Sequence, residues 1–218
     1  MKILQASLFQ YIDEQELLQM QKYRCMRRKK YEKNDIIFHT GERISEICAV
    51  LSGSVMIENV DLWGNKSILN HIGGAGQVFA ETYALCDEPM MVDAVCAENA
   101  EILFIDLKAL LADSKAPWYP KMLHNLLMIS AHMNLALSNR IFCTASKGIR
   151  PRLLTYLSEQ AVKNNSTEFI IPFNRQQLAD YLNLDRSALS KELGRMQKEG
   201  LLSFHKNRFK LLCTEKSI

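Results

Sequence analysis

The sequence has 218 residues, of which 48% are hydrophobic and 23% are charged. This length suits one or two globular domains, and the composition excludes a disordered or collagen-like chain. The N-terminus lacks the pattern of a signal peptide, and no run of about 18 apolar residues predicts a membrane span. We therefore expect a cytoplasmic protein that makes no contact with a membrane.

The net charge of +3 is distributed unevenly along the chain. Residues 1–143 carry 14 Lys and Arg against 17 Asp and Glu, whereas residues 144–218 carry 13 against 7. A basic C-terminal third beside a mildly acidic body predicts that the C-terminal part meets a polyanion. The six cysteines form no CxxC motif. We expect them to be small buried side chains, with a redox or metal role as the alternative.

The first half of the chain changes from helical to strand patterns. Apolar residues at helical spacing over 7–22 predict a short N-terminal helix or a pair of helices. The run RCMRRKKYEKND (24–35) predicts a solvated edge strand and a turn. Over residues 36–105, short apolar runs alternate with turns, most of which contain glycine. This pattern indicates an antiparallel β-roll.

A long helix is predicted over residues 117–143. Pro117 and Pro120 mark its start, because proline is favoured in a first helical turn. Apolar residues then recur at spacings of three and four: Met122, Leu126, Ile129, Met133, Leu137 and Ile141. One edge of this helix is expected to cover the β-roll, and a second edge to pair with another copy of the chain. The alternative is a helix that packs wholly on its own domain.

After a helix over 148–161 and an extended piece at 169–172, residues 174–204 carry the strongest pattern. Asn174 and Gln177 have the spacing of a capping box, which predicts the start of a helix. A tight turn follows, with Asp185 as the expected cap of a second helix that ends at Gly200. Apolar positions fall where two crossed helices would pack. The segment therefore predicts a helix-turn-helix.

The second of these helices presents polar residues on the side away from its apolar face: Arg186, Ser187, Ser190 and Lys191. These side chains can donate to phosphates and to base edges in the major groove of DNA. Residues 201–212 then read as strand, basic turn with Lys206, and strand, which is the pattern of a wing. The alternative is a structural helical hairpin with solvated charges.

With these parts in order, the sequence resembles the cAMP receptor/fumarate–nitrate regulator (Crp/Fnr) family of bacterial transcription factors. Residues 41–57, 146–157 and 175–193 carry the resemblance, and the last two resemble the versions common in anaerobic Gram-positive bacteria. It implies an α+β fold. A jelly-roll-like antiparallel β-roll of the cyclic-nucleotide-binding type is expected over 1–116, a long dimerisation helix over 117–145, and a winged helix-turn-helix over 146–218.

The resemblance also implies DNA contacts, position by position. Asn174, Arg175 and Gln176 match positions that hold phosphates in the family. Arg186, Ser187 and Lys191 match positions that read bases, and Ser190 lies beside them. Many members have glutamate where this chain has Ser187, so a different half-site is expected. Arg186, bidentate to a guanine, is then the main candidate for base reading.

The expected effector site departs from that of the cAMP-binding members. Ala80-Glu81 matches their Gly-Glu pair, but Met91-Val92 stands where their Arg-Ser pair holds the cyclic phosphate. A buried phosphate without a countercharge would cost several kcal/mol, so no cAMP binding is expected. The candidate pocket for a small apolar or aromatic ligand comprises Glu81, Thr82, Met91, Val92, Met133 and Asn134. A protein that binds no ligand there is the other possibility.

Other sensor chemistries in the family have specific requirements. An iron–sulfur regulator needs an N-terminal cysteine cluster, and this chain has only Cys25 there. Haem would need an axial ligand, for which His71, His124 and His132 are the candidates. We expect no cofactor, no metal site and no catalytic residue.

The sequence thus predicts a homodimeric DNA-binding regulator rather than an enzyme. Its expected partners are a pseudo-palindromic operator and RNA polymerase. Two rival hypotheses stay open at this stage. One is a ligand-binding β-roll module without DNA, and the other is a haem or redox sensor read out by the same DNA-binding domain.

Overall fold

The computed structural model describes residues 2–212. These fall into two compact units, with the boundary after Asn134. The first unit begins with η1 (Lys2–Gln5), η2 (Ser7–Phe9) and α1 (Glu14–Gln21). Its strands are β1 (Met26–Tyr31), β2 (Ile36–Phe38), β3 (Glu46–Ser52), β4 (Ser54–Val60), β5 (Lys66–Gly73), β6 (Val78–Phe79), β7 (Asp93–Cys96) and β8 (Ala100–Asp106). Short helices α2 (Glu81–Cys86) and α3 (Leu107–Leu110) complete it, together with the first part of α4 (Tyr119–Ala145).

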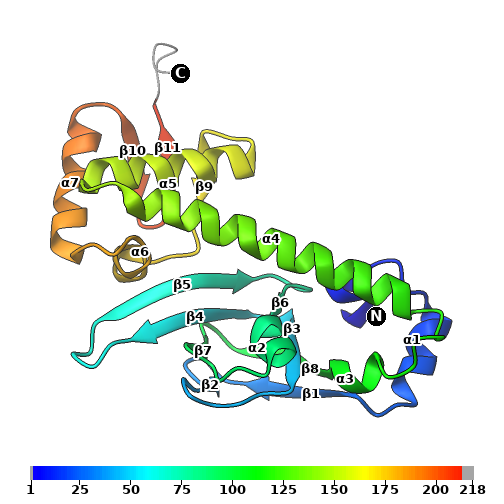
Figure 1. The fold of residues 1–218 in the computed structure, drawn as a ribbon. Helices are drawn as coiled ribbons and strands as arrows, with labels where there is room; N and C mark the ends of the chain where they lie inside the picture. The colour runs from blue at the N-terminus through cyan, green and yellow to red at the C-terminus, as the bar shows by residue number, and fades with distance from the viewer. Residues whose placement is uncertain (1, 213–218) are drawn as a thin grey trace. The chain divides into compact units, whose positions relative to one another are not determined.

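The strands form two four-stranded antiparallel sheets, in the orders β1-β8-β3-β6 and β2-β7-β4-β5. Strands β4 and β5 run side by side as a long hairpin (Figure 1). The predicted β-roll is therefore confirmed. The β3–β4 turn needs its glycine, because Gly53 has φ of +80° and a Cβ there would meet the backbone oxygen of Asn99 at 2.3 Å.

The apolar runs of β3 and β8 are continuous because their sheet is buried on both faces. In β3, Cys48 and Val50 pack into the interior between the two sheets, whereas Ile47, Ala49 and Leu51 pack against the N-terminal helices and α4. Strand β8 follows the same alternation. Strand β1 is the edge of this sheet, and its four basic residues are exposed, as its sequence predicted.

Helix α4 starts at Tyr119, two residues after the predicted start, so that Pro120 lies in its first turn and Pro117 precedes it. One face packs on the first unit through buried Met122, Leu126 and Ile129. On the same face, the amide nitrogen of Asn125 donates to the carbonyl oxygens of residues 8 and 10, at 2.8 Å each. Outside this buried face, α4 exposes several apolar side chains, among them Leu123, Leu127, Ile141 and Phe142.

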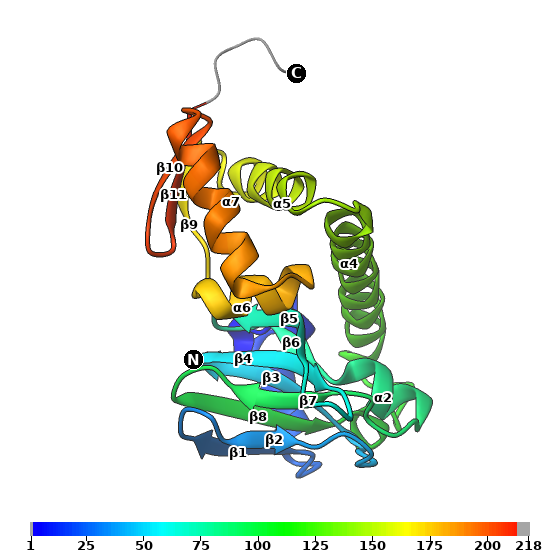
Figure 2. The same ribbon diagram turned by 90° about the vertical axis from the view of Figure 1, so that its left-hand side faces the viewer.

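The second unit contains the end of α4 and α5 (Ile149–Asn164), β9 (Glu168–Ile170), α6 (Arg175–Leu182), α7 (Arg186–Lys198), β10 (Leu202–His205) and β11 (Arg208–Leu211). Its sheet has the order β10-β11-β9. Figure 2 shows α6 leading into α7, and α7 into the β10–β11 hairpin. This is the predicted helix-turn-helix with its wing. Among residues 2–212, no helix is long and apolar enough to cross a membrane.

Candidate DNA-binding face and effector site

The caps of α6 and α7 hold the helix-turn-helix in its expected geometry. The Asn174 side chain accepts from the backbone N–H of Gln177 at 3.0 Å, and the Gln177 side chain accepts from the backbone N–H of Asn174 at 2.8 Å. The Asp185 carboxylate accepts from the backbone N–H of Ala188 at 2.8 Å, at the start of α7. Both predicted caps are confirmed. The turn between the helices is closed by Asn183, which has φ of +52°.

The start of α6 is tied to the wing. The Arg175 guanidinium lies over the rings of Phe204 and Phe209, at 4.9 and 5.7 Å from their centroids. It also donates to the backbone oxygen of Lys206 at 3.4 Å, and its burial lowers the pKa of Arg175. Gln176 is exposed but its amide donates to Asp180 at 2.7 Å. Arg175 therefore stabilises the contact between α6 and the wing, in addition to any contact that it makes with phosphate.

The outer side of α7 carries the predicted base-reading residues, and all of them are exposed. Within the described residues, Arg186, Ser190 and Lys191 make no side-chain hydrogen bond or ion pair with the rest of the chain. The Ser187 hydroxyl donates to the Asp185 carboxylate at 2.5 Å. This bond is the first cause, before the Ala188 N–H, of the lowered pKa of Asp185. Ser187 can thus offer DNA only an acceptor without breaking a bond.

The wing turn lies at Lys206, whose φ of +55° is unusual for a residue with a side chain. Lys206 is exposed in the turn between β10 and β11. The neighbouring Asn207 donates to the backbone oxygen of Ile171 at 3.1 Å, which fastens the tip to the segment before α6. Lys206 thus lies in the turn between two strands, as its sequence context predicted.

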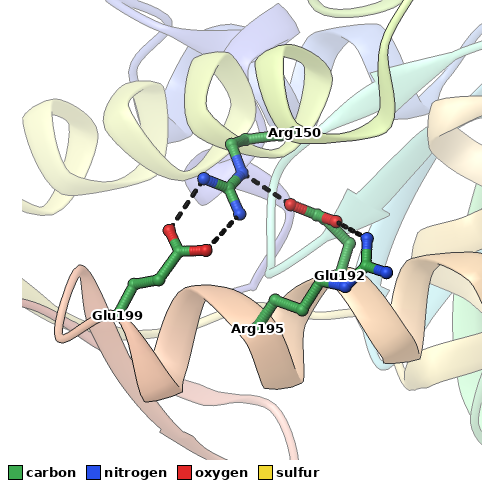
Figure 3. Close-up of polar contacts among 4 residues, drawn as sticks. All are labelled: Arg150, Glu192, Arg195 and Glu199. Atoms are coloured by element: carbon green, nitrogen blue, oxygen red, sulfur yellow. Dashed lines mark hydrogen bonds and ion pairs between the residues drawn. The ribbon is translucent and has the colours of Figure 1, made fainter.

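A polar network between α5 and α7 was not predicted from the sequence (Figure 3). Arg150 pairs with Glu199 through two bonds of 2.8 and 2.9 Å and with Glu192 through one of 2.5 Å. These carboxylates raise the pKa of Arg150, Glu199 first. The seven-residue spacing of Glu192 and Glu199 places both on one side of α7, so the sequence alone could have predicted that the two acids face a common partner. Their partner on another helix could not be read from spacing.

The acid of the expected effector site lies at the first position of α2. Glu81 is buried at 5% exposure, and the preceding Ala80 has φ of +67°. Burial raises the pKa of Glu81, while hydrogen bonds from its own backbone N–H and from the Thr82 side chain act in the opposite direction. A buried, hydrogen-bonded carboxyl group of this kind is suited to a hydroxyl or amine rather than to an anion.

The segment that would grip a phosphate is anchored to a neighbouring loop. The backbone N–H of Met90 donates to the carbonyl oxygen of Glu42 at 2.8 Å, and the N–H of Gly41 donates to that of Met90 at 2.7 Å. Met90 and Val92 are buried in the core between the sheets, whereas Met91 is 71% exposed. The structure therefore places Met90, rather than the predicted Met91, in the interior.

The two expected effector residues on α4 also differ in burial. Met133 is partly buried against the core that holds Val92, and the Asn70 amide donates to its sulfur at 3.8 Å. Asn134 is exposed, as is Thr82. Of the six predicted pocket residues, the structure thus buries Glu81, Val92 and, in part, Met133.

Thiols and imidazoles do not gather into a further site in the described residues. No group of three His, Cys, Asp or Glu has the geometry for a metal ion there. Cys25, Cys48, Cys96 and Cys143 are buried, Cys86 is exposed, and Cys213 lies outside the described residues. Burial raises the pKa of Cys96 to about 11 and that of Cys143 to about 12, which makes both thiols poor nucleophiles. Of the candidate haem ligands, His124 and His132 are exposed on α4 and His71 is half-buried in β5.

Comparison with known proteins matches each unit to a family model. Residues 28–112 match the cyclic nucleotide-binding domain, and residues 151–216 match the Crp-like helix-turn-helix domain. The chain is a Crp/Fnr family transcription regulator. Crp/Fnr regulators are not enzymes, and they bind DNA through this helix-turn-helix. The β-roll accordingly corresponds to the effector-binding domain of these regulators.

Similar proteins of the Crp/Fnr class share little sequence with this chain. The anaerobic regulatory protein of Haemophilus influenzae is 24% identical, over 88% of this chain and 75% of that protein. A CooA mutant from Carboxydothermus hydrogenoformans has the same fold with a TM-score of 0.73, at 19% identity, over 90% of this chain and 88% of that one. The regulator CLP of Xanthomonas campestris, described as responsive to c-di-GMP, gives a TM-score of 0.72 at 19% identity, over 93% of this chain and 100% of that one.

Proposed function

We propose that this Crp/Fnr regulator acts as a homodimer on a pseudo-palindromic operator, with one α7 in each of two major grooves. The observation that carries the proposal is the outer side of α7, where Arg186, Ser190 and Lys191 are exposed and have no partner within the described residues. Packing does not require this set, whereas a helix that reads base edges does. Half-sites about one helical turn apart are expected.

The proposed roles of individual residues follow from what their side chains already do. Arg186 reads a guanine, with Lys191 and Ser190 beside it, and Ser187 contributes an acceptor. Asn174, Arg175, Gln176 and Lys206 position the module on phosphates. Because Arg175 is held by the wing, we assign it the smaller share of that work.

We assign dimerisation to α4, on its exposed face. Leu123, Leu127, Ile141 and Phe142 are between 43% and 68% exposed and lie about 100–200° around the helix axis from Met122, outside the face that Met122, Leu126 and Ile129 bury. A helix with two apolar faces needs two partners. The sensor, dimer and DNA-binding roles then fall to residues 1–116, 117–145 and 146–218, with RNA polymerase as a further partner. That this regulator is of the subtype common in anaerobic Gram-positive bacteria stays a prediction.

We further propose that the effector is not cAMP. Met90 and Val92 fill the interior where a phosphate grip would stand, and Met91 occupies the position that holds an arginine in the cAMP-binding members. A small uncharged ligand that contacts Glu81 fits the buried carboxyl group better than an anion does. For haem, the candidate axial ligands are the three histidines named above. The alternative is regulation without a ligand in the β-roll.

Isothermal titration with cAMP should therefore show no binding at millimolar ligand. A dissociation constant in the micromolar range would overturn the proposal, because it would require an anion site that Met91 and Val92 cannot supply.

The experiment that tests DNA reading starts with selection of the operator from random duplexes. Arg186→Ala should then weaken operator binding by about tenfold, since each specific base contact contributes roughly 1–3 kcal/mol. The loss should disappear on an operator whose matching base pair is changed. Lys163→Gln is the control, because Lys163 is exposed at the end of α5. Equal weakening on every sequence would show that Arg186 contacts only phosphate.

A further inference from the structure

The start of α5 carries two arginines that reach to different parts of the helix-turn-helix. Arg150 binds Glu192 in the middle of α7 and Glu199 at its C-terminal cap (Figure 3). Arg152 donates from its Nη1 atom to the backbone oxygens of Leu182 and Asn183, at 3.0 Å each, where α6 ends. Two residues along a helix correspond to a rotation of about 200° around its axis, so the two arginine side chains leave α5 on nearly opposite sides. They therefore contact separate partners.

Arg152 also connects this module to the chain that precedes it. Its Nε atom donates to the backbone oxygen of Ser146 at 2.6 Å, in the short connector between α4 and α5. One planar guanidinium therefore joins the connector to the turn of the helix-turn-helix. Its positive charge also lies at the C-terminal end of α6, where the helix dipole is negative. A Lys side chain has the charge but not the rigid fork.

The Arg150 network has the features of a specific contact rather than of a loose surface pair. The Glu199 contact is bidentate, with the Arg150 and Glu199 side chains 36% and 47% exposed, and the Glu192 side chain is only 12% exposed. Glu192 also receives Arg195 from one turn further along α7, at 3.4 Å. Paired and bidentate contacts of this kind fix orientation more strongly than exposed single pairs do.

We propose that Arg150 and Arg152 are positioning residues for DNA reading: together they fix the turn and the C-terminal half of α7 on α5, and so set the angle at which α7 meets base edges. The proposal rests on the proposed role of α7 as the reading helix. Base contacts need tighter placement than phosphate contacts, because bidentate bonds to bases tolerate little displacement. Loss of the network should therefore lower discrimination between DNA sequences more than it lowers general affinity.

Two substitutions with opposite charge effects test this idea. Arg150→Gln removes a positive charge and Glu199→Gln removes a negative one, yet both break the same pair. Each should lower the ratio of operator affinity to scrambled-duplex affinity by about fivefold or more, the size of one lost base-pair contact. Lys163→Gln, which removes a positive charge from the exposed end of the same helix, should leave the ratio unchanged. Arg152→Lys should lower the ratio as well, although it keeps the charge.

The measurement is binding to both duplexes across a series of salt concentrations, with thermal melting of each variant. If Arg150→Gln and Glu199→Gln shift DNA affinity in opposite directions and leave the ratio of operator affinity to scrambled-duplex affinity unchanged, the network acts only through charge. The proposal is then wrong. A salt slope that falls by about one in Arg150→Gln would mean that Arg150 itself contacts a phosphate, which also overturns it. A loss on both duplexes that matches the unfolded fraction would show a purely structural role.

Failure of this proposal and failure of the function proposal give different results. If Arg186→Ala leaves the affinity ratio unchanged, α7 is not the reading helix. If Arg186→Ala lowers the ratio but Arg150→Gln and Glu199→Gln do not, α7 reads DNA and is positioned by its apolar core alone.

Discussion

Replacing Leu127 with Asp should convert the protein from a dimer to a monomer and weaken operator binding by at least about a hundredfold. Leu127 is 68% exposed on the apolar face of α4, so the change leaves the fold of one chain intact. In a symmetric helix pair, the substitution would bury two facing carboxylates without countercharges. A monomer holds only one half-site, and the affinity gained from linking two half-sites is lost.

Analytical ultracentrifugation checks this result directly, since the monomer mass is 25.0 kDa. Val162→Asp is the matched control, because Val162 is 82% exposed on α5, a helix that is not part of the proposed dimer face. It should remain dimeric and bind normally. A Leu127→Asp protein that still sediments as a dimer at micromolar concentration would place the dimer contact elsewhere.

Replacing Leu189 with Ala should destabilise the DNA-binding unit by about 2–5 kcal/mol, as large-to-small changes in a closed core do. Leu189 is fully buried in α7, on the side that faces the unit's core. Both tryptophans, Trp63 and Trp118, lie in the first unit. Tryptophan fluorescence therefore reports unfolding of the β-roll unit, whereas far-UV circular dichroism reports both units.

In urea, the Leu189→Ala protein should lose part of its helical signal early, while the fluorescence midpoint stays near the wild-type value. Leu154→Ala, at a position of α5 that is 39% exposed, should change either midpoint little. An equal shift of both signals would show that the two units unfold together, contrary to this prediction.

Local patterns predicted much of this architecture because their physical causes are local. The caps at Asn174 and Asp185 bond to backbone groups three residues away, so their spacing suffices to predict them. The strand runs of the β-roll were legible because apolar residues and turn residues alternate along the chain. Helix α2 was not predicted, since its six residues offer too short a pattern and its start depends on an unusual φ at Ala80.

The candidate sites were predictable to different degrees. The outer face of α7 follows from helical period alone, which is why all four of its polar residues are exposed as expected. The network of Arg150 and Arg152 depends on contacts across 30 to 49 residues of sequence, which no short pattern contains. For the effector site, correspondence with relatives placed Met91 inside, but local backbone bonding decides which methionine turns inward.

The anchoring of residues 87–92 to the loop at 39–43 has a consequence for how ligand specificity changes in evolution. Backbone bonds at Met90, together with a bond from Arg43 to the carbonyl oxygen of Asp87, determine which positions face the interior. A side chain introduced at position 91 therefore begins at the surface, whatever its chemistry. A basic residue introduced at position 91 alone would therefore not rebuild a buried anion site, because the backbone bonds at Met90 hold this position outside the core.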